Sequence, residues 1–351
     1  MNKNILIVTP DFNYCCGRSK HVFSLIKYFE QNDYNVIFLS NRGDSFSRLD
    51  SYLVKIIIIP NLFSKKIHHI FKNIIILKDI FKKNNINIIH SHHRFSDFLV
   101  SLTLFFTNLK INTVTTEHSI LKRKLFLNYY SKDLIAVSKV VKDNLINNYN
   151  ISEERVSLIP NFISVSNYNL KNAHTRDGSI KILSAGRFVE DKNYDLILYS
   201  VNYLSDKNKI LITLIGEGEK KHELKNLADK LTINIRFLPV QPDISKYISD
   251  SDICILTSKI EAFPTFMLEA GLFKKPFIGS DISGINGLIK DRHNGLLFKQ
   301  GNAKNLSEKI KLFIENPDLA KKCSVNLNED VMNQFTEEKI IPKVLKLYEK
   351  I

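Results

Sequence analysis

The sequence has 351 residues, of which 44% are hydrophobic, and a formal net charge of +14 at pH 7. A chain of this length and apolar content is long enough for two domains with buried cores, which excludes a largely disordered protein. The positive charge favours an anionic partner such as a nucleic acid, a membrane surface or a phosphorylated substrate. The four cysteines lack the spacing of a disulfide framework or a metal site, so we expect the protein to work in a reducing cytosol.

In the first half of the chain, short apolar runs alternate with amphipathic stretches, a pattern typical of parallel strands covered by helices. We expect strands at residues 5–8, 36–39, 54–59, 86–89, 113–116, 134–137 and 156–159, and helices at 21–29, 70–81, 95–106 and 139–149. No segment has the order of a signal peptide, and the apolar run 98–106 is shorter than the roughly 18 residues that span a bilayer. Positive charge is concentrated at residues 60–132, which hold twelve Lys and Arg but only three Asp and Glu.

Residues 164–180 are polar and lack periodicity, so they predict a linker. The alternating pattern then restarts, with strands expected at 182–185, 210–215, 233–238, 252–256, 277–278 and 295–298, and helices at 193–204, 220–231, 303–315 and 340–351. The sequence therefore predicts the α/β class, with two doubly wound Rossmann-like domains at 1–163 and 181–334 and a final helical segment at 335–351. Ligands of open parallel sheets bind beyond the carboxyl ends of the strands, so we expect the site in a cleft between the domains.

Two carboxylates flank the start of one expected helix in the second domain. Glu261 lies in the loop after the strand at 253–256, and Pro264 occupies the position where a helix takes its first residue. Glu269 follows within the helix, in an apolar run where a carboxylate requires a hydrogen-bond partner. The pair would suit a ligand with hydroxyl and phosphate groups, although a salt-bridged surface helix explains the same residues.

Cations and glycines follow other expected strands. Arg187 and Lys192 surround a strand-to-helix loop, where together they could hold a diphosphate, or simply form a solvated loop. Gly17 could let a phosphate approach a helix N-terminus, or form an ordinary turn. The run Gly216-Glu217-Gly218 lacks the third glycine of a dinucleotide fingerprint.

Several histidines also end strands. His90, His92 and His93 alternate as zinc ligands can, but no carboxylate or thiolate has a matching spacing, so we expect one of them to line a polar cleft instead. His118 ends the strand at 113–116 and is expected to face the same cleft. The pair Asp250 and Asp252 resembles the metal-binding acids of some sugar transferases, but its place before an apolar strand favours chance.

In this order the motifs resemble those of glycosyltransferase family 4, which comprises retaining enzymes of the GT-B fold. The likeness covers essentially the whole chain: Gly17, Glu117-His118, Ile159-Pro160-Asn161, Gly186-Arg187 with Lys192, Gly216-Glu217-Gly218, Glu261-Ala262-Phe263-Pro264, Glu269-Ala270, the stretch 293–298 and Gln334-Phe335-Thr336. The two glutamates separated by seven residues, with Phe-Pro between them, are the most specific element.

The resemblance implies an N-terminal acceptor-binding domain, a C-terminal donor-binding domain and a last helix that crosses back to the N-terminal domain. Arg187 and Lys192 would hold the donor diphosphate, assisted by Gly17 and by the backbone of Phe263, Pro264, Thr265 and Phe266. Glu269 would accept hydrogen bonds from the ribose, while Glu261 and His118 would face the donor sugar. Catalysis would require no metal and no cofactor besides the donor, and consist mainly of positioning and charge stabilisation.

The resemblance thus predicts transfer of a sugar, most commonly from a UDP-sugar, to a glycan or polyprenyl-diphosphate-linked acceptor in cell-surface polysaccharide synthesis. We expect a cytoplasmic protein whose basic N-terminal domain meets the anionic inner face of the membrane. Cys16 stands where the family often has a second glycine, and Pro239 and Pro242 flank the expected base site, so phosphate contact at Gly17 and the nucleotide stay open. A nucleotide-sugar epimerase of the GT-B fold and a nucleic-acid-binding protein are the alternatives, but the chain lacks the basic and aromatic motif of the latter.

Overall fold

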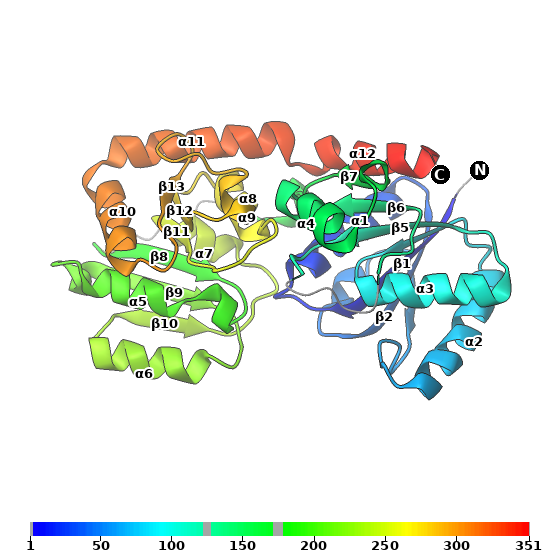
Figure 1. Ribbon diagram of the computed structural model, residues 1–351. Coiled ribbons are helices and arrows are strands. Elements are labelled where there is room, and N and C mark those ends of the chain that lie inside the picture. Colours follow the sequence, from blue (N-terminus) through cyan, green and yellow to red (C-terminus); the bar gives the residue numbers. More distant parts are fainter. Residues whose placement is uncertain (1–2, 122–127, 171–177, 351) are drawn as a thin grey trace. The chain divides into compact units, whose positions relative to one another are not determined.

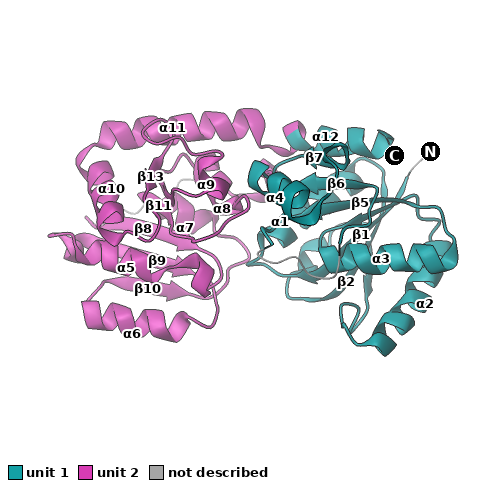
Figure 2. Cartoon of the chain, viewed as in Figure 1, with its two compact units in different colours: residues 1–161, 340–351 teal, residues 162–339 magenta. Residues whose placement is uncertain are grey.

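The computed structural model describes residues 3–121, 128–170 and 178–350. The chain forms two compact units, Met1–Asn161 with Ile340–Ile351, and Phe162–Lys339 (Figure 2). We call them unit 1 and unit 2. Residues 171–177 of the predicted linker and the basic residues Lys122, Arg123 and Lys124 lie outside the described residues.

Unit 1 is built on a parallel sheet of seven strands in the order β3-β2-β1-β4-β5-β6-β7 (Figure 1). The strands are β1 (Asn4–Phe12), β2 (Asn35–Gly43), β3 (Lys55–Ile58), β4 (Ile88–Ser91), β5 (Asn112–Glu117), β6 (Asp133–Ala136) and β7 (Val156–Leu158). The helices are α1 (Gly17–Gln31), η1 (Phe46–Leu49), α2 (Ile67–Lys83), α3 (Arg94–Thr107), α4 (Lys139–Tyr149), η2 (Glu153–Arg155) and α12 (Glu337–Lys350), which begins in unit 2 and continues into unit 1.

Helices cover both faces of this sheet, and the central strand β1 has buried apolar side chains on both of its faces, Ile5 to Val8. Leu6 and Val8 of β1 share a buried core with Leu77 of α2 and Leu99 of α3. On the other face, the Tyr348 ring of α12 packs against Phe29 of α1, with 5.8 Å between the ring centroids.

Unit 2 has a parallel sheet of six strands in the order β10-β9-β8-β11-β12-β13. The strands are β8 (Ile180–Ala185), β9 (Ile210–Ile215), β10 (Ile235–Leu238), β11 (Ile253–Leu256), β12 (Phe277–Ser280) and β13 (Leu296–Phe298). The helices are η3 (Val165–Asn167), η4 (Glu190–Lys192), α5 (Asp195–Asn202), η5 (Lys207–Lys209), α6 (Lys221–Leu231), α7 (Ser245–Asp250), α8 (Thr265–Leu272), α9 (Ser283–Asn286), α10 (Ala303–Glu315) and α11 (Pro317–Gln334). The predicted α/β class with two doubly wound sheets is confirmed.

Two local predictions need correction. Pro264 is the N-cap of α8 rather than its first residue, because its backbone is extended, with φ −72° and ψ 129°. Helix α11 was not predicted, because its buried residues Cys323, Ser324, Leu327 and Val331 form too narrow an apolar stripe to indicate a helix. Gly271 of α8 lets this helix lie close, since a Cβ there would be 2.7 Å from Val331 Cγ2.

Each sheet has one position where the strand order reverses. In unit 1 the chain builds outward from β1 to β3 and then returns to place β4 on the other side of β1. In unit 2 the same reversal places β11 beside β8. Such a reversal leaves a crevice at the carboxyl ends of the two central strands, where doubly wound sheets bind their ligands.

Candidate functional site

In unit 2, the residues that follow β8 and β11 meet at the reversal point of the sheet. Lys192 ends η4, after β8, and Glu261 lies in the loop after β11. The two side chains form an ion pair, and Ser258 Oγ donates a second hydrogen bond to Glu261 Oε1 at 2.6 Å. The Glu261 side chain is 10% exposed and that of Lys192 is 21% exposed. The predicted carboxylate and cation therefore lie together, at an edge that suits a charged ligand.

The backbone around this pair is fixed from two sides. Thr257 Oγ1 donates to the carbonyl of Lys192 at 3.0 Å, and the Lys259 amide donates to the carbonyl of Asp191 at 2.8 Å. Gly284 of α9 packs directly on the other side, because a Cβ there would lie 1.9 Å from the Glu261 carbonyl oxygen. These contacts hold the two loops in register and so orient the ion pair.

Glu269 is the second of the two predicted carboxylates. It lies on α8 and is 1% exposed, and Tyr168 Oη donates a hydrogen bond to its Oε1 at 2.7 Å. Buried carboxylates are costly without such donors, and Glu269 has the hydrogen-bond partner that its apolar surroundings predicted. Tyr168 is in turn packed edge-on against Phe273, with 6.1 Å between ring centroids.

The N-terminus of α8 lies between the two carboxylates. Phe263 and Phe266 are buried, and Phe263 packs against Phe335 at 5.3 Å between ring centroids. The first backbone N–H groups of an α-helix have no intrahelical acceptor, so those of Thr265 and Phe266 can donate to an anion. Contact of the Phe263–Phe266 backbone with the donor stays a prediction.

Arg187 lies in the loop between β8 and η4 and is exposed. The conformation of this loop depends on two glycines that follow β9. At Gly216, φ is +154° and a Cβ would lie 1.9 Å from the Gly186 carbonyl oxygen, while at Gly218 φ is +155° and a Cβ would lie 2.3 Å from the Phe188 carbonyl oxygen. The Gly216-Glu217-Gly218 run therefore serves close backbone packing against the Arg187 loop.

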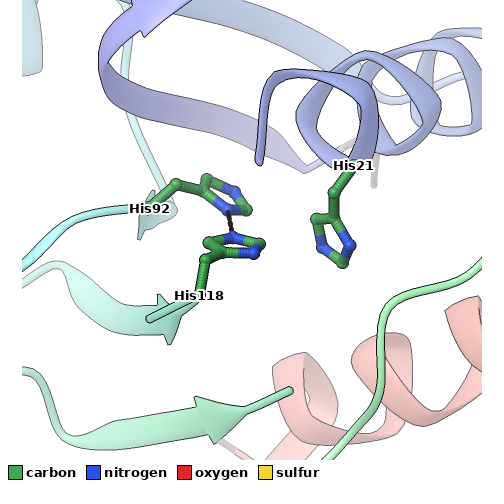
Figure 3. A group of neighbouring side chains, drawn as sticks. All are labelled: His21, His92 and His118. Atoms are coloured by element: carbon green, nitrogen blue, oxygen red, sulfur yellow. Dashed lines mark hydrogen bonds between the residues drawn. The ribbon is translucent and has the colours of Figure 1, made fainter. Parts of the chain in front are cut away.

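In unit 1, residues of three elements converge near the reversal point. His92 follows β4, His118 follows β5, and His21 lies on the first turns of α1, four residues after Gly17 (Figure 3). His92 Nδ1 and His118 Nε2 are 3.1 Å apart, and the His21 and His118 ring centroids are 4.9 Å apart. Burial lowers the pKa of His21 to about 3 and those of His92 and His118 well below the ordinary value, so all three rings are neutral at pH 7.

The other two histidines of the predicted cluster have structural partners. His90 lies under His92 and is hydrogen-bonded to Tyr348 Oη at 2.6 Å and to Thr116 Oγ1 at 2.7 Å. His93 is the N-cap of α3, where its Nδ1 accepts a bond from the Phe95 amide at 3.1 Å. Only His92 of this cluster lies beside His118.

Asp250 and Asp252 are also structural. Lys181 Nζ donates to Asp250 Oδ1 at 3.0 Å, and the Lys181 amide donates to Asp252 Oδ2 at 2.8 Å. These two bonds tie α7 and the start of β11 to β8. The interpretation of this pair as a chance resemblance to a metal-binding motif agrees with these contacts.

Two family models match the chain. Residues 17–167 match "Glycosyltransferase Family 4", and residues 168–330 match "Glycosyl transferases group 1". The chain belongs to glycosyltransferase family 4. Members of this family are retaining transferases with nucleotide-sugar donors, so this protein is a family 4 glycosyltransferase with a donor of that class.

Curated relatives of this family 4 glycosyltransferase include an uncharacterized glycosyltransferase of Methanocaldococcus jannaschii, 25% identical over 99% of this chain and 98% of the relative. The N,N'-diacetylbacillosaminyl-diphospho-undecaprenol alpha-1,3-N-acetylgalactosaminyltransferase of Campylobacter jejuni is 32% identical over 41% of this chain and 38% of the relative. The lipopolysaccharide core biosynthesis glycosyltransferase LpsE of Rhizobium meliloti is 26% identical over 47% of this chain and 48% of the relative.

Solved structures confirm the predicted GT-B fold of the family 4 glycosyltransferase. A glycosyltransferase from Rickettsia africae has a TM-score of 0.86 at 23% identity, covering 99% of this chain and 98% of that one. The Anabaena protein HepE in complex with UDP-glucose has a TM-score of 0.86 at 15% identity, covering 99% and 100%.

Three residues of the candidate site were not predicted from the sequence: Tyr168, Ser258 and His21. Tyr168 lies in the predicted linker, 101 residues from Glu269. His21 was assigned to the first helix only, since nothing in its spacing connects it to His92 or His118. One signal was available for Ser258, because it lies only two residues after the end of β11.

Proposed function

We propose that this family 4 glycosyltransferase moves a sugar, with retention of its anomeric configuration, from a UDP-sugar to a glycan or polyprenyl-diphosphate-linked acceptor in cell-surface polysaccharide synthesis. We further propose that catalysis needs no metal ion. The observation that carries the proposal is the buried Glu261 carboxylate paired with Lys192 at the reversal point of the sheet in unit 2, followed by a second buried carboxylate, Glu269, on α8.

In the proposed donor complex, Arg187 and Lys192 bind the diphosphate. The Arg187 guanidinium can hold two phosphate oxygens at once, and no described residue forms an ion pair with it. The N–H groups at the start of α8 and Gly17 at the start of α1 assist as further anion-binding groups. Their common effect is to stabilise the charge that develops as the diphosphate leaves.

The two carboxylates recognise the hydroxyl groups of the donor. Glu269 accepts hydrogen bonds from the ribose, and Glu261 accepts them from the transferred sugar. Carboxylates are strong acceptors for hydroxyl donors, and both are already held in a buried, low-dielectric edge where such bonds are effective.

In the proposed transfer, the acceptor hydroxyl oxygen bonds to the anomeric carbon on the face from which the diphosphate departs. The bond from that carbon to the diphosphate oxygen breaks, and the hydroxyl proton moves to the departing diphosphate oxygen. No separate general base is needed, so catalysis rests on positioning and charge stabilisation. His118, neutral through burial, is proposed to act as a hydrogen-bonding group for the donor sugar.

The acceptor class is supported by the names of relatives, which refer to an undecaprenol-linked substrate in Campylobacter jejuni and to the lipopolysaccharide core in Rhizobium meliloti. No helix within the described residues is long and apolar enough to cross a membrane. In keeping with the names of these relatives, we propose that the protein is cytoplasmic and reaches a lipid-linked acceptor by binding to the membrane surface.

The surface proposed for membrane contact is the outer side of α2. Ile67, Phe71 and Ile75 are 72%, 59% and 69% exposed and recur every four residues, so they form one stripe. The same spacing continues to Asp79 and Lys83, which form an ion pair, and further exposed lysines lie around the stripe: Lys65, Lys66, Lys72, Lys78 and Lys82. Apolar side chains flanked by lysines fit an anionic lipid surface, in which the rings and methyl groups enter the interface while the ammonium groups meet the headgroups.

The function is tested first by donor binding and then by transfer. We expect UDP to raise the melting temperature of the wild-type chain, because at about 100-fold excess over Kd a ligand adds about 2.7 kcal/mol of stability. Arg187→Ala and Glu269→Ala should each lose this shift, while Arg236→Ala and Glu329→Ala, on the exposed surface of the same unit, should keep it.

Transfer is then measured with radiolabelled UDP-sugars and a bacterial lipid extract as acceptor. Each of the two site variants should lower kcat/KM by about 100-fold, the usual effect of removing one preorganised group that stabilises the transition state. Unchanged transfer in both variants would refute the assignment. Conversion of the donor without any acceptor would indicate the epimerase instead.

A further inference from the structure

The carboxylate of Glu117 lies directly before His118 in the chain, and the proposed transfer gives it no role. Glu117 is the last residue of β5 and is 4% exposed. We propose that Glu117 and its hydrogen-bond donor Tyr129 are positioning residues, which fix the backbone of His118 so that its imidazole faces the donor sugar. This role rests on the proposed function, in which His118 hydrogen-bonds that sugar.

The Glu117 side chain closes a turn around His118. Its Oε1 accepts hydrogen bonds from the Ser119 amide at 2.9 Å and from Ser119 Oγ at 2.6 Å. On the other side of His118, Glu117 itself is paired with Ala136 of β6 in the sheet. The peptide groups before and after His118 are therefore both held, one by the sheet and the other by the carboxylate. Fixed backbone dihedrals in turn fix the direction in which the His118 side chain leaves the chain.

Tyr129 fixes the carboxylate. Tyr129 is 3% exposed, and its hydroxyl donates to the second oxygen of the carboxylate, Glu117 Oε2. The Tyr129 ring packs edge-on against Tyr149, with 5.5 Å between the ring centroids, and Arg94 donates to Tyr149 Oη at 2.7 Å. Each Glu117 oxygen thus has its own donor, so the carboxylate cannot turn without leaving a buried hydroxyl unsatisfied.

The His118 ring has different neighbours from the Glu117 carboxylate. His92 Nδ1 is 3.1 Å from His118 Nε2, and the His21 ring lies edge-on at 4.9 Å between centroids (Figure 3). Glu117 therefore acts on this ring through the backbone, as a positioning residue, and not by contact with the sugar. Its removal should leave nucleotide binding intact and slow the transfer step.

The test is a double-variant cycle in the UDP-sugar transfer assay. Tyr129→Phe removes only the hydroxyl and should lower kcat by about tenfold, while the thermal shift produced by UDP, which carries no sugar, stays as in the wild type. In a His118→Ala background the same substitution should lower kcat by less than about twofold, because the residue that it positions is gone. A hydroxyl that merely stabilised the fold would lower kcat by the same factor in both backgrounds.

Three single variants complete the set. Glu117→Ala should lower kcat at least as much as Tyr129→Phe does. Glu117→Gln keeps an oxygen that can accept the bond from the Ser119 amide, so its kcat should stay within about threefold of the wild type. Tyr130→Phe is the matched control, since it removes the neighbouring hydroxyl from a ring that is 50% exposed, and it should transfer as the wild type does.

Circular dichroism establishes that each variant is folded. If Tyr129→Phe does not fold, Ser119→Ala takes its place in the cycle, since it removes the 2.6 Å bond to the same carboxylate and should lower kcat by about threefold. Equal losses in the two backgrounds overturn the proposal, as does full transfer by Tyr129→Phe. Normal transfer by His118→Ala also overturns it, whereas the proposed function is decided separately by Arg187→Ala and Glu269→Ala.

Discussion

Replacing Lys192 with methionine is expected to destabilise the protein more than replacing Lys192 and Glu261 together. In the wild type the two side chains form an ion pair in which Glu261 is 10% exposed. Lys192→Met keeps the length of the side chain but removes its charge. Of the two contacts described for the Glu261 carboxylate, only the hydrogen bond from the Ser258 hydroxyl, at 2.6 Å, then remains. The cost comes from the uncompensated charge.

The magnitude follows from burial. Removing one partner of a fully buried ion pair costs about 3–5 kcal/mol. Lys192 is 21% exposed, so water already screens part of the attraction, and we expect about 2 kcal/mol for Lys192→Met. Adding Glu261→Gln removes the buried charge, so the double variant should lie within about 1 kcal/mol of the wild type. The coupling energy of the cycle is then about 1–2 kcal/mol.

The assay is urea unfolding of the full chain, followed by circular dichroism, for the wild type, both single variants and the double variant. UDP-sugar transfer is measured in parallel, and we expect the double variant to regain stability without regaining activity. That split would separate a structural ion pair from a pair that binds the donor. If Lys192→Met unfolds at the wild-type urea concentration, or if the two single effects simply add, the ion-pair reasoning is wrong.

Two further outcomes follow from packing and exposure. The double variant Phe71→Ser/Ile75→Ser should reduce cosedimentation with phosphatidylglycerol vesicles by about tenfold or more, since each lost apolar side chain contributes up to about 1.5–3 kcal/mol. The control is Tyr203→Ser, which removes a 64% exposed ring from unit 2. Equal binding of the wild type and both variants would contradict the proposed membrane surface. Gly216→Ala should cost about 2–3 kcal/mol of stability and weaken UDP binding, because its Cβ would meet the Gly186 carbonyl that precedes Arg187. Gly301→Ala, at φ +74° with nothing within 4 Å, measures the backbone strain alone and should leave UDP binding unchanged.

The strands and the reversal edges could be predicted from the sequence because parallel strands buried on both faces appear as short apolar runs. Each run ends directly before the residues of interest, as Leu256 does before the loop of Glu261. The chain path then places those residues at carboxyl ends of neighbouring strands. The need of Glu269 for a partner could be predicted too, since the surrounding residues are apolar.

The identity of the partners could not be predicted in this way. Tyr168 and Glu269 are 101 residues apart, and Lys192 and Glu261 are 69 apart, so no local periodicity connects them. His21 reaches His92 and His118 from a helix on the sheet rather than from a strand end. The role of Gly216 was equally hidden, because the close backbone approach to Gly186 depends on how two loops pack.

The different partners of the two carboxylates support the different roles proposed for them. Glu261 is held by a cation and a serine hydroxyl, and its backbone is in close contact with Gly284, so its carboxylate has little freedom to turn. A rigid acceptor discriminates between sugar hydroxyls of different configuration, since a misplaced hydroxyl leaves it unsatisfied. Glu269 receives a hydroxyl donor from Tyr168, the same chemical group that a ribose presents. A nucleoside can therefore replace that bond at little cost, which supports the proposal that Glu269 binds the ribose of the donor while Glu261 selects the sugar.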